Sequence, residues 1–254
     1  MKTARNNDKF LMRRVRSWTR SPQFYLQKAR EAVFGVDTIL FQKKRETYSV
    51  GSFEWLALTE TLYGGLQLGG VTSKTDRGGD RMSPYYHGYG RCYAEFLKPF
   101  ISANRTERLT LVEVGILNGS GLAIWCDLFP NARVIGFDVD PSNFQANRKS
   151  LEQAGAFQKN VPEVHSFDQL DSRKANDVLR DVLGENRVDI AIDDGCHSLE
   201  SIEITFEAIR PFFAPRFVYF VEDNFDTYDY LAPRHREYRW TTRGEITVAT
   251  NLRS

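Results

Sequence analysis

The sequence lacks any long apolar segment that could cross a membrane. Its apolar stretches stay below the roughly 18 residues that a transmembrane helix needs. The pair Arg13-Arg14 resembles a twin-arginine signal, but the residues that follow it, 15–20, do not form a hydrophobic region. We therefore predict a protein without a transmembrane segment, located in the cytoplasm.

Cysteine and net charge are also scarce. Three cysteines, odd in number and far apart in the chain, exclude a disulfide framework and a zinc-binding pattern. The formal net charge of +1 gives no overall attraction to nucleic acid or to a membrane surface. Residues 1–30 are the exception, with nine Lys or Arg and one Asp. We interpret this basic arm as a solvated segment; the alternative is contact with an anionic partner, such as a phosphorylated sugar or a lipid surface.

Apolar and amphipathic segments alternate from residue 109 onward. The apolar segments predict strands at 109–115, 132–138, 163–167, 188–193 and 216–222, and helices are predicted between them at 121–129, 141–154, 171–183 and 198–210. Such alternation is typical of a doubly wound, mostly parallel sheet, so the predicted fold class is α/β and Rossmann-like. The 31 residues after Asp223 fit one more strand, at 245–250, and are few for a helix and a hairpin.

The preceding part of the chain predicts helices and a loop. Helices are expected at 22–34, 52–66 and 91–101, and a polar, glycine-bearing loop at 72–80. His87 lies among three tyrosines just before the third helix, where it fits either a substrate pocket or the core. We therefore divide the chain into a basic arm with helices, residues 1–70, and an α/β domain, residues 71–254.

Three glycines follow the first predicted strand. This strand ends at Gly115, and Gly119 and Gly121 complete a G-x-x-x-G-x-G turn that enters the next helix. Glycines at such a turn let the backbone approach a nucleotide-like ligand closely. The second strand ends in Asp138, whose carboxylate is placed to hold the hydroxyl groups of a ribose. Together they predict a nucleotide-binding edge.

Acidic residues gather where the fourth and fifth predicted strands end. Asp193 and Asp194 end one strand, and Glu222 and Asp223 follow the other. The carboxyl ends of parallel strands lie at one edge of the sheet, where carboxylates repel one another unless a cation compensates. Oxygen ligands favour Mg²⁺, Ca²⁺ or Mn²⁺ over zinc, so we predict a divalent-cation site. The alternative is that these acids cap helices and accept loop hydrogen bonds.

His197 lies three residues after Asp194. A neutral imidazole beside a metal-bound hydroxyl is a suitable general base, so we predict that role for it. The alternative is a histidine at the start of a helix that bonds a nearby carboxylate.

These motifs resemble those of a known enzyme family. Residues 113–121 are similar to the cofactor motif of class I S-adenosylmethionine-dependent methyltransferases. Residues 192–197 together with 221–223 resemble the metal-dependent sugar O-methyltransferases of macrolide antibiotic pathways, and the related family named cephalosporin hydroxylases. Residues 75–78 and 87–93 are similar to a family segment that contains Asp-Lys-Gly, in which Arg77 replaces the lysine.

The resemblance implies S-adenosylmethionine and Mg²⁺ as cofactors and a hydroxyl of a sugar or glycan as methyl acceptor. It implies that Asp194, Glu222 and Asp223 bind the metal, and that His197 and Asp194 are catalytic. Asp138 would hold the cofactor ribose and Asp168 the adenine amino group, and the full cofactor-binding set would be Glu113, Gly115, Gly119, Gly121, Asp138, Asp168 and Asp193. Rhizobial nodulation enzymes that 2-O-methylate fucose are similar in size, which suggests fucose as the acceptor.

Several other interpretations stay open. Asp223-Asn224 also fits a catechol-type O-methyltransferase, although that class normally offers a lysine base where this chain has His197. A hydroxylase would need an iron site, which one histidine and scattered carboxylates form poorly. A non-catalytic protein with the same fold and a homo-oligomer are further possibilities. Nucleic-acid methylation is not expected, because the sequence has no Asn/Asp-Pro-Pro-Tyr motif.

Overall fold

One seven-stranded sheet organises the computed structural model, which describes residues 38–64, 80–82 and 87–252. Its strands are β1 (Thr110–Val114), β2 (Arg133–Asp138), β3 (Glu163–Ser166), β4 (Val188–Asp193), β5 (Phe213–Val221), β6 (Arg239–Arg243) and β7 (Ile246–Thr250). Their order is β3-β2-β1-β4-β5-β7-β6, with β1 to β5 parallel and β7 antiparallel to both of its neighbours. The predicted doubly wound, mostly parallel α/β sheet is confirmed.

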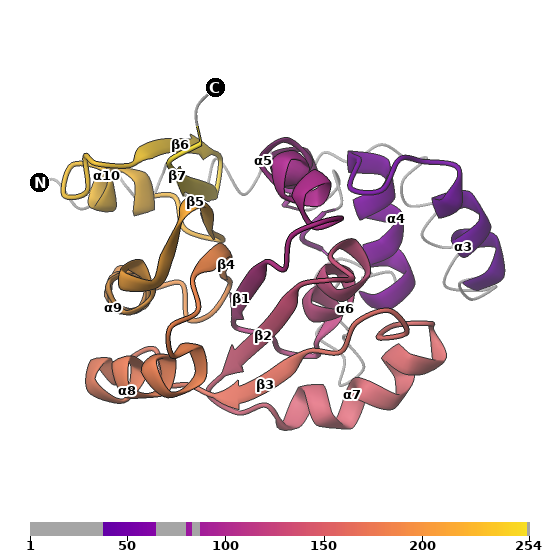
Figure 1. The fold of residues 1–254 in the computed structure, drawn as a ribbon, viewed down its shortest axis with the longest axis horizontal. Helices are drawn as coiled ribbons and strands as arrows, with labels where there is room; N and C mark the ends of the chain where they lie inside the picture. The colour runs from indigo at the N-terminus through magenta and orange to yellow at the C-terminus, as the bar shows by residue number, and fades with distance from the viewer. Residues whose placement is uncertain (1–37, 65–79, 83–86, 253–254) are drawn as a thin grey trace, which may run out of the picture.

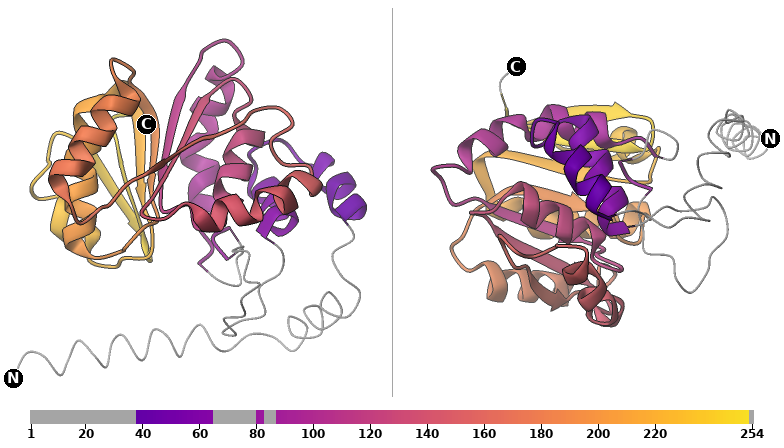
Figure 2. Two further views of the ribbon diagram at one scale, coloured as in Figure 1. Left: turned by 90° about the horizontal axis from the view of Figure 1, so that it is seen from below. Right: turned by 90° about the vertical axis from the view of Figure 1, so that its right-hand side faces the viewer.

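Helices cover both faces of the sheet (Figure 1; Figure 2 shows the layers from two further sides). One face carries α4 (Phe53–Gly64), α5 (Gly90–Ala103), α6 (Ser120–Leu128) and α7 (Ser142–Gln153), with α3 (Thr38–Glu46) outside α4. The other face carries α8 (Ser172–Leu183), α9 (Leu199–Ile209) and the short α10 (Thr227–Leu231), and a 3-10 turn, η1 (Arg210–Phe212), follows α9. The helix expected at 22–34 and most of the loop expected at 72–80 lie outside the described residues.

Two helices that leave the carboxyl edge of the sheet begin at side-chain caps. The Asp171 carboxylate accepts from the amide of Lys174 at 3.1 Å at the start of α8, and the Ser198 hydroxyl accepts from the amide of Ser201 at 3.1 Å at the start of α9. Such caps satisfy amide groups that have no partner within the helix. They fix where the loops after β3 and β4 end, and these loops carry site residues.

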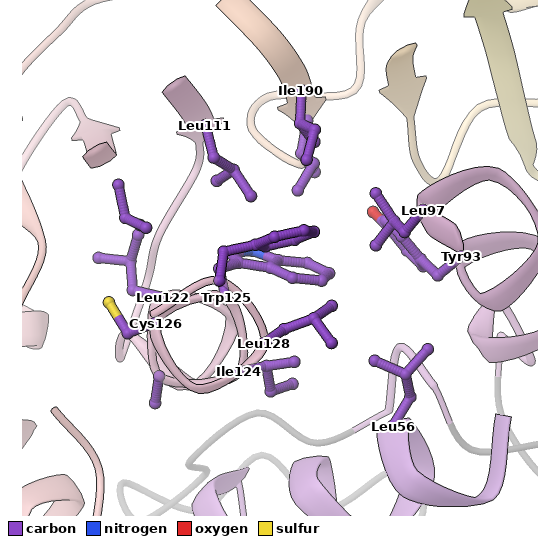
Figure 3. Close-up of a cluster of buried hydrophobic side chains, with 14 of the residues drawn as sticks. Leu56, Tyr93, Leu97, Leu111, Leu122, Ile124, Trp125, Cys126, Leu128 and Ile190 are labelled. Atoms are coloured by element: carbon purple, nitrogen blue, oxygen red, sulfur yellow. The ribbon is translucent and has the colours of Figure 1, made fainter. Parts of the chain in front are cut away.

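The core between the sheet and its first helical layer centres on Trp125 of α6. Figure 3 shows its indole ring between side chains of the sheet, of α4 and of α5. Trp125, Leu111 of β1 and Leu56 of α4 are all fully buried in one hydrophobic cluster. Helix α4 therefore packs as part of the α/β core, although it precedes the domain boundary predicted at residue 70, which itself stays a prediction.

The expectation of a single strand after Asp223 is wrong, because the chain forms α10 and then a hairpin of β6 and β7. Arg243 pairs with Ile246, which leaves Gly244 and Glu245 as the loop. Gly244 has a φ of +69° at the first loop position, where a tight hairpin turn of type II′ needs a glycine. The turn is short enough for 31 residues to hold a helix and two strands.

None of the helices within the described ranges combines the length and the apolarity needed to traverse a bilayer.

Candidate active site

The glycine turn joins β1 to α6 at the carboxyl edge of the sheet. Gly115 has a φ of +85°, and its amide donates to the carbonyl of Phe137 in β2 at 2.8 Å. A Cβ atom on Gly115 would lie 2.1 Å from the carbonyl oxygen of Asp194. Glycine is therefore needed here both for the backbone conformation and for the close approach of the loop after β4. Gly119, with a φ of +79°, forms the N-cap of α6.

The third glycine of the motif makes room for a buried ion pair. A Cβ atom on Gly121 would lie 2.3 Å from Oε1 of Glu113. That oxygen accepts from Nη1 of Arg81 at 2.7 Å, and Glu113 is fully buried. Burial raises the pKa of Glu113, and the positive charge of Arg81 opposes this effect. The sequence predicted Glu113 as a cofactor ligand, whereas the structure places its carboxylate against Arg81.

A cavity of about 520 Å³ lies over the glycine turn, and Asp138 and Asp168 both line it. This volume suits an organic ligand of moderate size. Oδ2 of Asp138 accepts from the amides of Ile116 and Leu117, each at 3.0 Å, so Asp138 also fixes the turn. The same cavity is lined by three exposed apolar side chains: Leu117, Val139 and Leu170.

Asp193 does not line this cavity, although the sequence predicted a cofactor contact for it. Successive residues of a strand point to opposite faces of the sheet. Asp193 therefore shares the α8–α9 face with Ala191, where its carboxylate accepts from Nε2 of Gln169 at 2.7 Å and from the Tyr219 hydroxyl at 3.1 Å. Burial raises the pKa of Asp193 to about 7, and these hydrogen bonds counteract part of the rise.

Gln169 connects Asp193 to the loop after β4, and sequence reasoning missed it. Its Nε2 donates to Asp193 and also to the hydroxyl of Thr205 at 2.8 Å, while its Oε1 accepts from the amide of Cys196 at 2.8 Å. A Cβ atom on Gly195 would lie 1.9 Å from the same oxygen. Gln169 therefore holds the backbone that carries Asp194 and His197.

The structure brings Asp194, His197 and Asp223 together at the cavity. Each offers one ligand atom, and these three atoms lie within 4.8 Å of one another, which suits a divalent cation. Nε2 of His197 lies 4.0 Å from Oδ2 of Asp223. His197 and Asp223 adopt positive φ values of +58° and +60°, a backbone conformation that is uncommon for residues other than glycine. All three side chains are half-buried and line the cavity.

Glu222 lies apart from this group. Its carboxylate is buried, accepts from the Tyr93 hydroxyl and pairs with Nε of Arg81 at 3.0 Å. Burial raises the pKa of Glu222 although Arg81 opposes the rise. Of the three expected metal ligands, Asp194 and Asp223 therefore line the cavity, whereas Glu222 is buried beneath it against Arg81 and Tyr93.

Arg81 is the main site residue that the sequence did not reveal. Its guanidinium contacts Glu113, Asp194 and Glu222, which lie at the ends of three neighbouring strands. The basic residue singled out in the sequence, Arg77, lies outside the described residues. A signal was present, because the dipeptide Asp80-Arg81 repeats Asp76-Arg77 four residues later.

His87 also belongs to the site rather than to the hydrophobic core. Its Nδ1 lies 3.1 Å from Oδ1 of Asp223 and 3.3 Å from Oε2 of Glu245, and its Nε2 lies 3.7 Å from Asp80. Burial lowers the pKa of His87, but hydrogen bonds to Asp80 and Glu245 and the charge of Asp223 outweigh burial and raise the pKa to about 11. Imidazolium at this position would partly neutralise the acidic edge.

Comparisons with known proteins point to one fold. No protein-family model matches the chain. The 8-demethyl-8-alpha-L-rhamnosyl tetracenomycin-C 2'-O-methyltransferase of Streptomyces olivaceus is 29% identical over 146 residues, which are 54% of this chain and 33% of that protein. The structure of MycE methyltransferase from the mycinamycin biosynthetic pathway, in complex with Mg and SAH, is 16% identical at a TM-score of 0.51, over 66% of this chain and 50% of that one. The chain has the Rossmann-like methyltransferase fold.

The chain matches about a third of the length of the curated relative and half of the solved structure. In the methyltransferase fold of this chain, the residues that line the cavity, apart from Asp80, lie at the carboxyl ends of the strands or in the loops that follow them. Ligands of open α/β sheets bind at that edge. The cavity is therefore the candidate site of the methyltransferase fold.

Proposed function

We propose that this protein is an S-adenosylmethionine-dependent O-methyltransferase that acts on a hydroxyl group of a sugar. The observation that carries the proposal is the division of one cavity into two halves. One half has the glycine turn, Asp138 and Asp168; the other has Asp194, His197 and Asp223. The sequence relative is named as a 2'-O-methyltransferase of a rhamnosyl compound, which supports a deoxysugar acceptor.

The first half fits the nucleoside part of the cofactor. The Asp138 carboxylate is half-buried at the cavity wall, where it would accept hydrogen bonds from ribose hydroxyls. Asp168 is exposed at the same wall and would accept from the adenine amino group. The exposed apolar side chains of Leu117, Val139 and Leu170 would pack on the flat adenine ring.

A smaller cavity, of about 70 Å³, continues from the glycine turn toward Arg81. It is lined by charged and polar side chains that include Glu60, Asp80, Arg81 and Ser120. Groups of both charges fit the ammonium and the carboxylate of an amino acid, so the methionine part of the cofactor would enter here.

The second half fits the acceptor. The sulfonium cofactor would supply an activated methyl group, and a divalent cation held by Asp194 and Asp223 would lower the pKa of the acceptor hydroxyl. The imidazole of His197 is half-buried, faces the cavity, and would accept the proton of that hydroxyl. Asn224 fixes the position of His197, because its Nδ2 donates to the His197 carbonyl at 2.8 Å.

The hydrogen bonds of the Asn224 side chain favour a sugar acceptor over a catechol. A catechol-type enzyme would use the Asp223-Asn224 pair at the metal, but the Asn224 amide oxygen accepts from the amide of Asp226 at 2.8 Å and from the Thr227 hydroxyl at 3.1 Å. The amide group of Asn224 therefore serves the loop. Fucose and rhamnose are our first candidate acceptors; a cytoplasmic location and a homo-oligomer remain predictions.

A product assay by mass spectrometry tests the proposal. Purified protein is incubated with S-adenosylmethionine, Mg²⁺ and panels of deoxysugar derivatives, glycans and catechols. We expect methylated sugar and loss of turnover in Asp194→Asn, in His197→Gln or with excess chelator, while S-adenosylhomocysteine still binds. Methylation of catechols alone would favour the second candidate. Failure of the wild-type protein to bind S-adenosylhomocysteine would overturn the assignment of the methyl donor.

A further inference from the structure

Gln169 lies between two residues of the first half of the cavity, but it is itself buried. Asp168 and Leu170 are exposed, whereas Gln169 is only 8% exposed. Its side chain reaches the loop after β4, although β2 and β1 separate β3 from β4 in the sheet. That loop carries His197, which belongs to the second half of the cavity, so a single side chain connects the two halves.

The partners of the Gln169 amide group determine its orientation. Oε1 accepts from the backbone amide of Cys196 at 2.8 Å, and Nε2 donates to the Asp193 carboxylate at 2.7 Å and to the Thr205 hydroxyl at 2.8 Å. A backbone amide can only donate, so the oxygen of Gln169 must face Cys196 and its two N–H groups must face the other partners. The side chain therefore holds the Cys196 peptide in one position.

His197 follows this anchored peptide directly. Its φ of +58° is a conformation that a histidine keeps only where the surrounding structure holds it. On its other side, Nδ2 of Asn224 donates to the His197 carbonyl at 2.8 Å. The backbone of His197 is thus held by Gln169 from the loop after β3 and by Asn224 from the loop after β5.

The loop after β3 has other anchors besides the Gln169 side chain. The Phe167 amide donates to the last carbonyl of β2 at 2.8 Å, and Oδ1 of Asp168 accepts from the amide of Leu170 at 2.9 Å. Loss of the Gln169 side chain leaves both of these contacts in place, whereas the Cys196 amide loses its partner. The change should therefore affect the second half of the cavity more than the first.

We propose that Gln169 is a positioning residue for methyl transfer. It fixes the peptide that precedes His197 and so sets where the imidazole meets the acceptor hydroxyl, without touching either substrate. Because a displacement of about 1 Å can slow a reaction about a hundredfold, one buried hydrogen bond at this point matters for the rate. The inference rests on the proposed function for the task of His197, but the hold of Gln169 on the loop can be measured without turnover.

Steady-state kinetics of two matched variants of the full chain test the proposal. Gln169→Met keeps the length of the side chain but cannot accept from Cys196; Thr205→Val removes a hydroxyl from the same network and leaves that contact in place. We expect kcat of Gln169→Met to fall by about tenfold to a hundredfold, with KM for S-adenosylmethionine and the affinity for S-adenosylhomocysteine changed by less than about threefold. Thr205→Val should change all three by less than about threefold. Equal losses of kcat in the two variants, or a loss confined to cofactor affinity, would overturn the proposal.

An exchange of the two polar partners keeps the test available if Gln169→Met does not fold. Gln169→Glu alone sets a second carboxyl group against Asp193, and like charges repel, so kcat should fall. Adding Asp193→Asn restores a donor and acceptor pair, because the new amide can donate to the new carboxylate, whose other oxygen accepts from Cys196. We expect the double variant to recover kcat to within about fivefold of the wild type. A folded double variant without this recovery would contradict the proposal.

Hydrogen exchange separates this inference from the proposed function. Mass spectrometry follows the amides of residues 194–197 in the wild type, Gln169→Met and Thr205→Val. Loss of one hydrogen bond should speed their exchange about fivefold or more in Gln169→Met and leave it unchanged in Thr205→Val. No methyl transfer by the wild type, together with this faster exchange, would refute only the proposed function. Methyl transfer by the wild type, with unchanged exchange in Gln169→Met, would refute only this inference.

Discussion

Replacement of Asp193 by asparagine should make the stability of the protein less dependent on pH. The Asp193 carboxyl group is buried, and its pKa rises from 3.8 to about 7 because burial penalises the charged form. A carboxyl group whose pKa is higher in the folded than in the unfolded state stabilises the fold only while it is protonated. Its contribution is complete below the unfolded pKa of 3.8 and is lost as the pH rises through about 7.

The two pKa values set the size of the effect. Their difference of about three units corresponds to about 4 kcal/mol in the free energy of unfolding, of which about 3 kcal/mol falls between pH 4.5 and 8. An amide at this position accepts from Gln169 as the carboxylate does, and its NH₂ group can donate to the Tyr219 hydroxyl. Asp193→Asn thus mimics the protonated acid at every pH.

Urea denaturation followed by tryptophan fluorescence, in chelator, measures this difference. We expect the free energy of unfolding of the wild type, minus that of Asp193→Asn, to fall by about 3 kcal/mol from pH 4.5 to 8. Glu152→Gln serves as the control, because Glu152 is an exposed carboxylate that is 48% accessible. A difference that stays constant over this range would refute the reasoning, since Asp193 would then titrate alike in both states.

Three further predictions concern the turn and the core. Gly121→Ala should lower the free energy of unfolding by about 1 to 3 kcal/mol in urea denaturation, because its Cβ would lie 2.3 Å from Glu113; an unchanged midpoint would show that the buried pair can shift. Leu56→Ala, at a fully buried position in α4, should cost about 2 to 5 kcal/mol, and a loss below this range would mean that α4 is peripheral. Asp138→Asn should weaken S-adenosylhomocysteine binding about tenfold in calorimetry, through one charged hydrogen bond; equal affinity would exclude the ribose contact.

The strands and the glycine turn could be predicted from the sequence because their signals are local. A run of apolar residues predicts a buried strand at the same positions. A glycine at position 115 likewise indicates a turn there, and Gly115 does have a φ of +85°. The side-chain alternation along β4 also predicts the orientation of Asp193, because Ala191 and Asp193, two residues apart, must lie on the same face of the sheet. Because Asp193 and Asp194 are adjacent in the sequence, both are predicted in the site, whereas in the structure only Asp194 lines the cavity.

The contacts of Arg81, Gln169 and His87 could not be predicted in this way. Arg81 reaches residues 32 and 113 positions away, at Glu113 and Asp194. His87 meets Glu245, 158 positions away, only because the β6–β7 turn returns to the carboxyl edge. These pairings depend on how loops cross the edge of the sheet, and no periodicity of the sequence records that path.

The position of β7 has a consequence for the order in which the fold can form. β7 follows β6 in the chain, yet it lies between β5 and β6 in the sheet. During synthesis, the edge of β5 therefore stays unpaired after β6 has left the ribosome, and an open edge can pair with other chains. We expect chains truncated before residue 246 to leave this edge of β5 unpaired and to aggregate more readily than chains that include β7.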